Sequence, residues 1–289
     1  MRERQTVPIH RPGKLRRRLL KAFGLCSLLW VVVPARAELA LYGGNEKTRA
    51  HLRSLIEAEL TDAQPSQRDF AVTVGAQALA DFCAREARVP VLATYLYANR
   101  LETAGAGCQQ SLAALPVDPP VDVLLRLASA LFPESTAARL VDEGAAATAT
   151  DPTLLALPIP ENGVARGLGR LVSDGQWDVF LMPVDPAVFR GADYRLALET
   201  LFRHRKPAIV SVQSLLSQGA VAAAFYSQEA LDSALRQTIR HWVATGEWVA
   251  QPPTRVEVQV NETVLRHGYG RVLAEREARA LEVEVNSGE

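Results

Sequence analysis

The residues with useful chemistry in this sequence gather just after short apolar segments, where glycines and polar side chains recur. The candidates are Gly43, Gly44, Gly75, Gln77, Thr94, Tyr95, Asp185 and Ser214. Glycine lets a backbone approach a ligand closely, and the N–H groups that open the following helix can hold an anion. Amide and hydroxyl side chains offer neutral hydrogen bonds, tyrosine offers a stacking surface, and a carboxylate can hold an ammonium group. The pattern predicts a binding site for a small molecule.

Catalytic motifs are missing from the sequence. The five histidines stand at positions 10, 51, 204, 241 and 267, and they form no His-x-x-x-His pair. There is also no Cys-x-x-Cys pair, no Gly-x-Ser-x-Gly elbow and no Walker loop. Gly167-Leu-Gly169 is a bare Gly-x-Gly within a helical pattern, which favours a packing role. We therefore expect no catalytic residue, no metal site and no cofactor, and we expect that the protein is not an enzyme.

The first 37 residues have the pattern of a secretory signal peptide. A basic cluster at 14–21 precedes an apolar run of 12 residues at 22–33, and Ala35-Arg-Ala37 follows as a small-x-small cleavage pattern. The apolar run is too short for a membrane anchor, which needs about 20 residues. We expect cleavage after Ala37 and a location in the periplasm.

Removal of the signal peptide changes the charge of the chain. The first 37 residues contain nine of the 32 basic residues and one of the 32 acidic residues, so the mature chain keeps 23 basic and 31 acidic residues. Its net charge is therefore near −8. Nucleic-acid binding requires a basic surface, and we expect no nucleic-acid partner.

Two cysteines remain in the mature chain, Cys83 and Cys108. In an oxidising compartment they could form a disulfide that closes a loop of about 25 residues. The alternative is a buried Cys83 in a helix and an unpaired Cys108 in a loop. The sequence leaves both interpretations open.

Short apolar runs alternate with amphipathic segments along the mature chain, which predicts an α/β fold. The runs lie at 39–42, 69–74, 89–94, 137–141, 153–157, 177–182, 207–212 and 219–226. Strands that are apolar along their whole length are covered on both faces, as in parallel sheets. Helices are expected between most runs, with a helix capped by Ser227 and a half-exposed strand at 255–260.

Four segments carry a resemblance to a known family. They are residues 70–78 (FAVTVGAQA), 89–94 (VPVLAT), 177–185 (WDVFLMPVD) and 206–227, which includes KPAIVS and QGAVAAAFYS. In this order they resemble the substrate-binding proteins of ABC transporters with the type I periplasmic-binding fold, the group that includes tryptophan and tyrosine binders. The sequence departs from that pattern at Ala76-Gln77, where the family has a small Thr or Ser, and at Tyr95-Leu-Tyr97.

The resemblance implies two Rossmann-like lobes with parallel sheets, joined by crossover hinge strands. We expect a signal peptide at 1–37, a first lobe from 38–118 plus 228–289, and a second lobe from 119–227. The implied function is capture of a small, amino-acid-like molecule between the lobes for ABC-type uptake through an inner-membrane permease. The alternative is an orphan periplasmic sensor or interaction module that presents its closed form to a membrane receptor or an outer-membrane transport system.

Overall fold

The computed structural model describes residues 39–85, 88–141, 153–161, 163–186 and 188–287. The expected signal peptide and its cleavage site lie outside the described residues. Within the described part of the chain no helix combines the length and the apolar character needed to cross a membrane.

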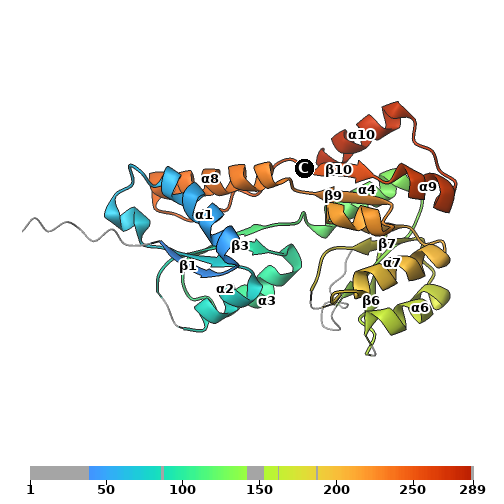
Figure 1. Cartoon of the computed structure of the whole chain (residues 1–289), viewed down its shortest axis with the longest axis horizontal. Helices are drawn as coiled ribbons and strands as arrows, with labels where there is room; N and C mark the ends of the chain where they lie inside the picture. Colours follow the sequence, from blue (N-terminus) through green and yellow to red (C-terminus); the bar gives the residue numbers. More distant parts are fainter. Residues whose placement is uncertain (1–38, 86–87, 142–152, 162, 187, 288–289) are drawn as a thin grey trace, which may run out of the picture. The chain divides into compact units, whose positions relative to one another are not determined.

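The first sheet contains four parallel strands in the order β1-β2-β3-β4 (Figure 1). The strands are β1 (Ala40–Gly43), β2 (Ala71–Val74), β3 (Val91–Leu96) and β4 (Leu112–Pro116). Every residue of β2 is buried, because helices cover the sheet on both faces.

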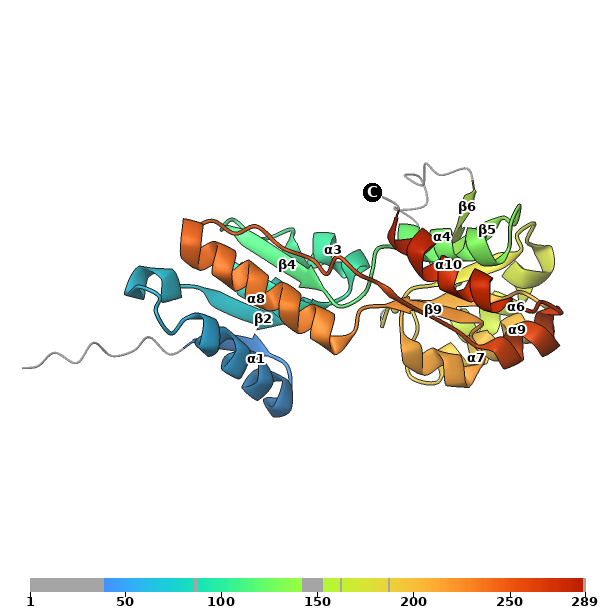
Figure 2. The same cartoon turned by 90° about the horizontal axis from the view of Figure 1, so that it is seen from above.

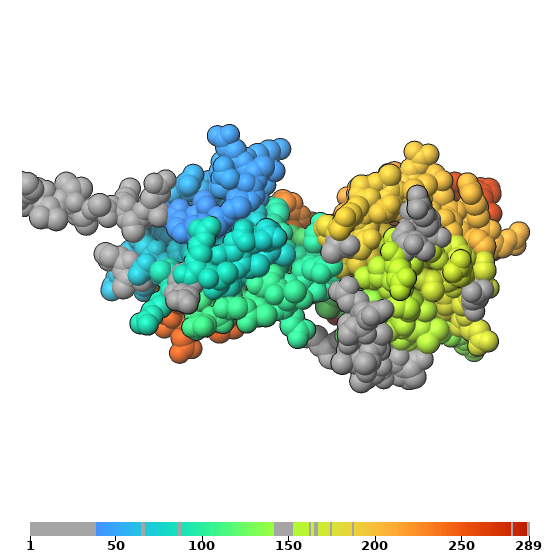
Figure 3. Space-filling model, turned by 90° about the horizontal axis from the view of Figure 1, so that it is seen from below, coloured from blue at the N-terminus to red at the C-terminus, as the bar shows by residue number. Residues whose placement is uncertain are grey.

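Four helices cover the first sheet. Helices α1 (Glu46–Glu59) and α8 (Gln228–Thr245) pack on one face, where Ile56, Val72 and Ile239 share a core. Figure 2 shows α8 running along this sheet. Helices α2 (Ala76–Cys83) and α3 (Leu101–Gly105) pack on the other face, which Figure 3 shows as the cyan to green surface. Short 3₁₀ turns, η1 (Pro65–Arg68) and η2 (Ala98–Arg100), complete this lobe.

The connection from β1 through α1 to β2 has an unusual hand. The chain moves across the sheet in one direction from β1 to β4, yet α1 lies on the opposite face from α2 and α3. Two crossovers that move in the same direction with helices on opposite faces must have opposite hands. Since right-handed crossovers are the strong rule, we infer that β1–α1–β2 is the left-handed one.

The second sheet has the order β10-β9-β8-β7-β5-β6, and among its described strands only the β10–β9 pair is antiparallel. The strands are β5 (Ala137–Val141), β6 (Leu154–Pro158), β7 (Val179–Met182), β8 (Ala208–Val210), β9 (Ala222–Phe225) and β10 (Glu257–Val260). The strand order reverses at β5, which pairs with β6 on one side and β7 on the other. Ligands of open α/β sheets bind outside the strand ends at such a reversal.

Helices cover both faces of the second sheet as well. One face carries α6 (Val164–Asp174), α7 (Asp193–Arg203) and the turn η3 (Gln213–Gln218). The other face carries α4 (Val121–Leu131), α9 (Glu262–Tyr269) and α10 (Glu275–Asn286). The predicted α/β class with two largely parallel sheets is confirmed.

The end of the chain divides between the two lobes. The sequence assigned all of 228–289 to the first lobe, and α8 does pack there. The structure differs beyond α8, because β10 pairs with β9 and α10 contributes Leu281 and Val285 to the core of the second sheet. The segment 257–286 therefore belongs to the second lobe, and three connections join the lobes, at 117–120, 226–227 and 246–256.

Cys83 at the end of α2 and Cys108 beyond α3 form a disulfide, with their Cα atoms 4.5 Å apart. The sequence left open whether Cys83 and Cys108 are bridged, and in the structure they are. The bridge holds α2 and the segment after α3 together on one face of the first sheet.

Candidate ligand-binding site

The glycines and Thr94 lie together at the carboxyl edge of the first sheet. Gly43 aligns with Val74, and Val74 aligns with Thr94 in the strand register. The amide of Gly75 donates a hydrogen bond to the carbonyl of Thr94 at 2.9 Å. Because parallel strands end at the same edge, the residues after each strand become neighbours, as the sequence predicted.

Gly43 and Gly44 are needed for close packing. Both have positive φ, +76° and +66°. A Cβ on Gly43 would lie 2.6 Å from the Cβ of Ala78, and one on Gly44 would lie 2.7 Å from a methyl group of Val74. These glycines let the turn after β1 pass directly over the start of α2.

A cavity of about 310 Å³ opens beside this turn. Its lining comprises Tyr42, Gly43, Gly44, Val74, Gln77, Ala78, Asp81, Phe82 and Arg85. The side chain of Gln77 donates a hydrogen bond to Asp81 at 2.8 Å. Three of the predicted site residues, Gly43, Gly44 and Gln77, thus border one cavity.

Tyr95 has a backbone conformation that is rare for a residue with a side chain, with φ of +54°. Its hydroxyl oxygen accepts a hydrogen bond from Nε2 of Gln228 at 3.1 Å, and the same Gln228 nitrogen donates to Asp232 at 2.7 Å. Strained backbone of this kind persists only where the surroundings fix it, and it is often found at functional sites.

Asp185, which follows β7, is bound by residues that follow β3. Nη2 and Nε of Arg100 donate to its Oδ1 at 2.7 and 3.0 Å, and Asn99 donates to its Oδ2 at 2.6 Å. The side chains of Arg100 and Asp185 are only 21% and 10% exposed. The sequence predicted Asp185 as a ligand residue, but it gave no indication of the partner Arg100.

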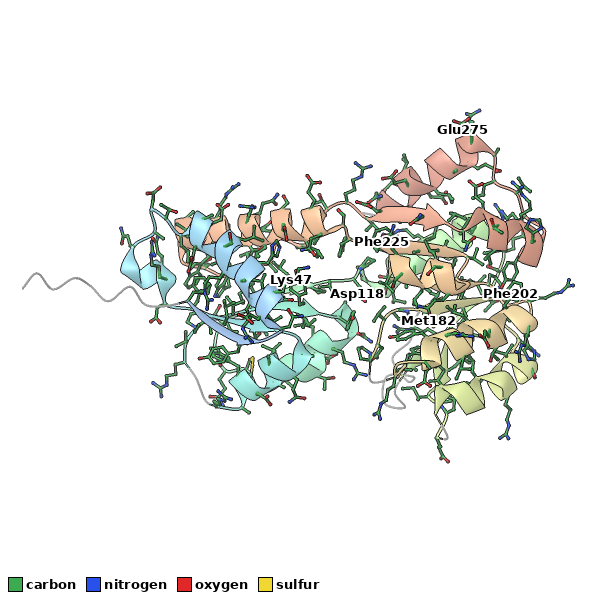
Figure 4. The ribbon with its side chains drawn as sticks, in the orientation of Figure 1. Lys47, Asp118, Met182, Phe202, Phe225 and Glu275 are labelled. Carbon is green, nitrogen blue, oxygen red and sulfur yellow. A yellow bond between two sulfur atoms is a disulfide. The ribbon has the colours of Figure 1, made fainter. Side chains whose placement is uncertain are left out.

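Asp118, which follows β4, is a second buried carboxylate that the sequence analysis missed. It is 4% exposed, and its Oδ1 accepts a hydrogen bond from the amide of Ala98 at 2.8 Å. Burial raises the pKa of Asp118 to about 6, against the lowering effect of hydrogen bonds that include the Ser211 hydroxyl. The negative charge of Asp185 contributes to this rise. Figure 4 labels Asp118 on the connection between β4 and α4.

Three tyrosines lie near enough to Asp118 for its negative charge to affect their pKa values. Burial raises the pKa of Tyr97, Tyr194 and Tyr226, and the Asp118 carboxylate raises each pKa further. Tyr194 also accepts a hydrogen bond through its hydroxyl oxygen from the amide of Asp185 at 3.0 Å. The pKa of Tyr194 reaches about 12, so this phenol stays neutral.

These residues form what we call the strand-end cluster. Its members are Tyr97, Asn99, Arg100, Asp118, Asp185, Tyr194, Ser211 and Tyr226. They follow β3 and β4 of the first sheet and β7, β8 and β9 of the second, with Tyr194 at the start of α7. The cluster combines charged groups, hydrogen-bonding groups and aromatic rings, which are the components of a small-molecule site.

Ser214 lies apart from the other predicted residues. It borders a cavity of about 620 Å³ formed by η3 and the segment from the end of β10 into α9. Within the described ranges no group of three or more His, Cys, Asp or Glu side chains is arranged to hold a metal ion.

The fold is that of the solute-binding proteins, as comparison with solved structures shows. The L-Trp complex of an ABC domain from Streptococcus pneumoniae has a TM-score of 0.52 at 13% identity, covering 83% of this chain and 97% of that one. A ligand-free, open substrate-binding protein with adhesive properties from Clostridium difficile gives 0.54 at 14% identity, with 83% and 96% covered.

A conserved domain protein from Vibrio cholerae gives a TM-score of 0.58 at 12% identity, again covering 83% of this chain and 96% of that one. No family model matches the sequence. No curated protein matches it either. The predicted resemblance in fold is therefore confirmed by structure, and the low identities leave function to be argued from the site.

Proposed function

We propose that this protein is an exported solute-binding protein that captures a small molecule between its two lobes. The observation that carries the proposal is the strand-end cluster, in which residues after strands of both sheets contribute to one group of polar and aromatic side chains. In open α/β sheets such positions are where ligands bind. The two lobes and their three connections are the architecture on which hinge closure operates.

In this proposal the first lobe contributes Gly43, Gly44, Gly75, Gln77, Thr94 and Tyr95, and the second contributes Asp185. The Arg100–Asp185 ion pair joins the two lobes, because Arg100 follows a strand of the first sheet and Asp185 follows a strand of the second. A ligand that interacts with either group competes with that pair. Such competition would couple binding to movement of the lobes.

A thermal-shift screen of the purified protein against amino acids, amines and related metabolites tests the proposal. A ligand at 100 times its Kd stabilises the native state by about 2.7 kcal/mol. For a chain of this size, that corresponds to a rise in Tm of roughly 5 °C or more. If no compound in a broad screen raised the Tm, the proposal of ligand capture would be wrong.

We further propose that the captured molecule is delivered to an inner-membrane permease for ABC-type uptake. Deletion of the gene should then abolish accumulation of the radiolabelled ligand found in the screen, and expression of the full chain should restore it. If uptake persisted while a ligand-dependent transcriptional response disappeared, the protein would be a periplasmic sensor instead.

A further inference from the structure

The strand-end cluster contains one carboxylate whose charge is not balanced. Arg100 is the cation of Asp185, and both of its donors in that pair are directed to the same carboxylate oxygen. Within the described residues Asp118 has only neutral donors, which are the Ala98 amide, its own amide and the Ser211 hydroxyl. Among the residues that the structure describes, no Lys, Arg or His makes an ion pair with Asp118.

The charges of the cluster therefore sum to about −1 when both aspartates are ionised. Burying an ionised carboxylate without a cation is costly, which agrees with the raised pKa of Asp118. A neutral ligand would leave that cost in place, and a carboxylate ligand would increase it. A ligand with a single positive charge would remove it.

The aromatic surroundings favour the same ligand class. Tyr97, Tyr194 and Tyr226 all lie within electrostatic range of Asp118. Tyrosine rings attract organic cations through their electron-rich faces, and cages of such rings recognise ammonium groups. The phenols remain neutral, because burial and the Asp118 carboxylate raise their pKa values.

We infer that the ligand is an organic monocation that places its ammonium group against Asp118 and carries no carboxylate. This inference rests on the proposed function, since it names the class of molecule which the same site captures. Asp118 is the residue that determines the charge of the ligand, because Arg100 is already the cation of Asp185 in this structure.

The experiment compares probes that differ only in charge, using thermal shift and calorimetry on the purified protein. Choline is compared with 3,3-dimethylbutan-1-ol, in which carbon replaces the charged nitrogen, and tyramine is compared with tyrosine, which adds a carboxylate. We expect at least one amine to bind, and to bind at least about tenfold more tightly than its neutral or carboxylated counterpart.

The variant Asp118→Asn keeps an oxygen that can accept from Ala98 and removes the charge. We expect it to weaken amine binding by about tenfold or more. Asp62→Asn is the matched control, because it removes one carboxylate at an exposed position and should leave binding unchanged.

A pH series on the unmodified protein provides a second measurement if Asp118→Asn does not fold. Amine affinity should fall below pH 6 as Asp118 takes up its proton. The other ionisable groups that interact with Asp118 are Asp185, Tyr97, Tyr194 and Tyr226, and Arg100 is paired with Asp185. Of these, Tyr97, Tyr194 and Tyr226 have pKa values raised above the ordinary value for a phenol, so they do not titrate near pH 6.

The outcomes separate this inference from the proposed function. If tyrosine, a neutral compound or an anion binds and Asp118→Asn binds it equally well, ligand capture stands and the inference about charge is wrong. If amines bind with an affinity that neither Asp118→Asn nor pH changes, Asp118 is not the recognition group. If no compound in the broader screen binds, both the proposal of ligand capture and this inference are wrong.

Discussion

Two carboxylates of the strand-end cluster, Asp118 and Asp185, have different partners and therefore different chemistry. Asp185 receives two hydrogen bonds from a guanidinium and one from an amide side chain. In the part of the chain that the structure describes, Asp118 receives hydrogen bonds from neutral donors only, and burial raises its pKa to about 6. Near neutral pH the two residues therefore differ mainly in whether a cation accompanies the charge.

The Arg100–Asp185 pair should contribute more to stability than an exposed pair of the same type. Asp185→Asn leaves Arg100 mostly buried without a counter-charge, and we expect a loss of about 2 to 3 kcal/mol in the free energy of unfolding. Glu199→Gln removes the carboxylate of the exposed Arg195–Glu199 pair and should cost less than about 0.5 kcal/mol. Urea unfolding measures both, and equal losses would contradict this expectation.

Asp118 should make stability depend on pH in an identifiable way. Its pKa is raised from 3.8 to about 6 in the folded protein, so between these values the folded state holds a proton that the unfolded chain has lost. The contribution of Asp118 is thus most favourable below about pH 4 and becomes unfavourable as pH rises through 6. At pH 7 the cost is on the order of 3 kcal/mol.

Asp118→Asn should remove this dependence. Its advantage over the unmodified protein in free energy of unfolding should grow from near zero at pH 4 to about 2 to 3 kcal/mol at pH 7. Chemical unfolding at several pH values measures the difference, in which the contributions of other groups cancel. A difference independent of pH would show that Asp118 keeps an ordinary pKa.

Sequence patterns could locate residues at strand ends, but they could not show which of them meet. Asp185 follows an evident apolar strand, so its position was predictable. Asp118 lies in Val-Asp-Pro-Pro, a sequence typical of a linker, and β4 before it is rich in alanine and ends in proline. Its burial depends on Ala98 and Ser211, which are distant in sequence and come together only through the tertiary fold.

At the scale of elements, the strands were predicted well because apolar runs of β-branched and aliphatic residues are strong signals. β5 has its predicted bounds, 137–141, and β7 and β8 lie within their predicted runs. β4 and α9 were missed as elements. The lobe assignment of 257–286 was also wrong, since alternation along β10 shows a half-exposed strand without showing which sheet it joins.

The disulfide should stabilise the first lobe. It closes a loop with a sequence separation of 25 residues, which corresponds to about 3 kcal/mol if the bridge acts by restricting the unfolded chain. The variant with both Cys83→Ser and Cys108→Ser should lose about that much free energy of unfolding. Thiol titration of the denatured, unreduced protein is the control, and two reactive thiols would mean that the bridge does not form.

At the scale of the whole molecule, ligand capture by two lobes predicts closure around hinges at the three connections. Saturating ligand should reduce the radius of gyration in solution X-ray scattering, because the lobes approach one another. A profile that does not change at saturation would contradict this mechanism. The Asp118→Asn variant with the same amine is the matched control for effects of the added compound.

Each lobe includes a segment from the last quarter of the chain, and this has a consequence for biogenesis. The first sheet lacks one of its covering helices until α8 has been synthesised, and the second lacks its antiparallel edge strand until β10 has been synthesised. The apolar surfaces of both lobes therefore stay partly uncovered until synthesis of the chain is almost complete. A chain cut after Tyr226 should aggregate or be degraded, because it lacks both α8 and β10.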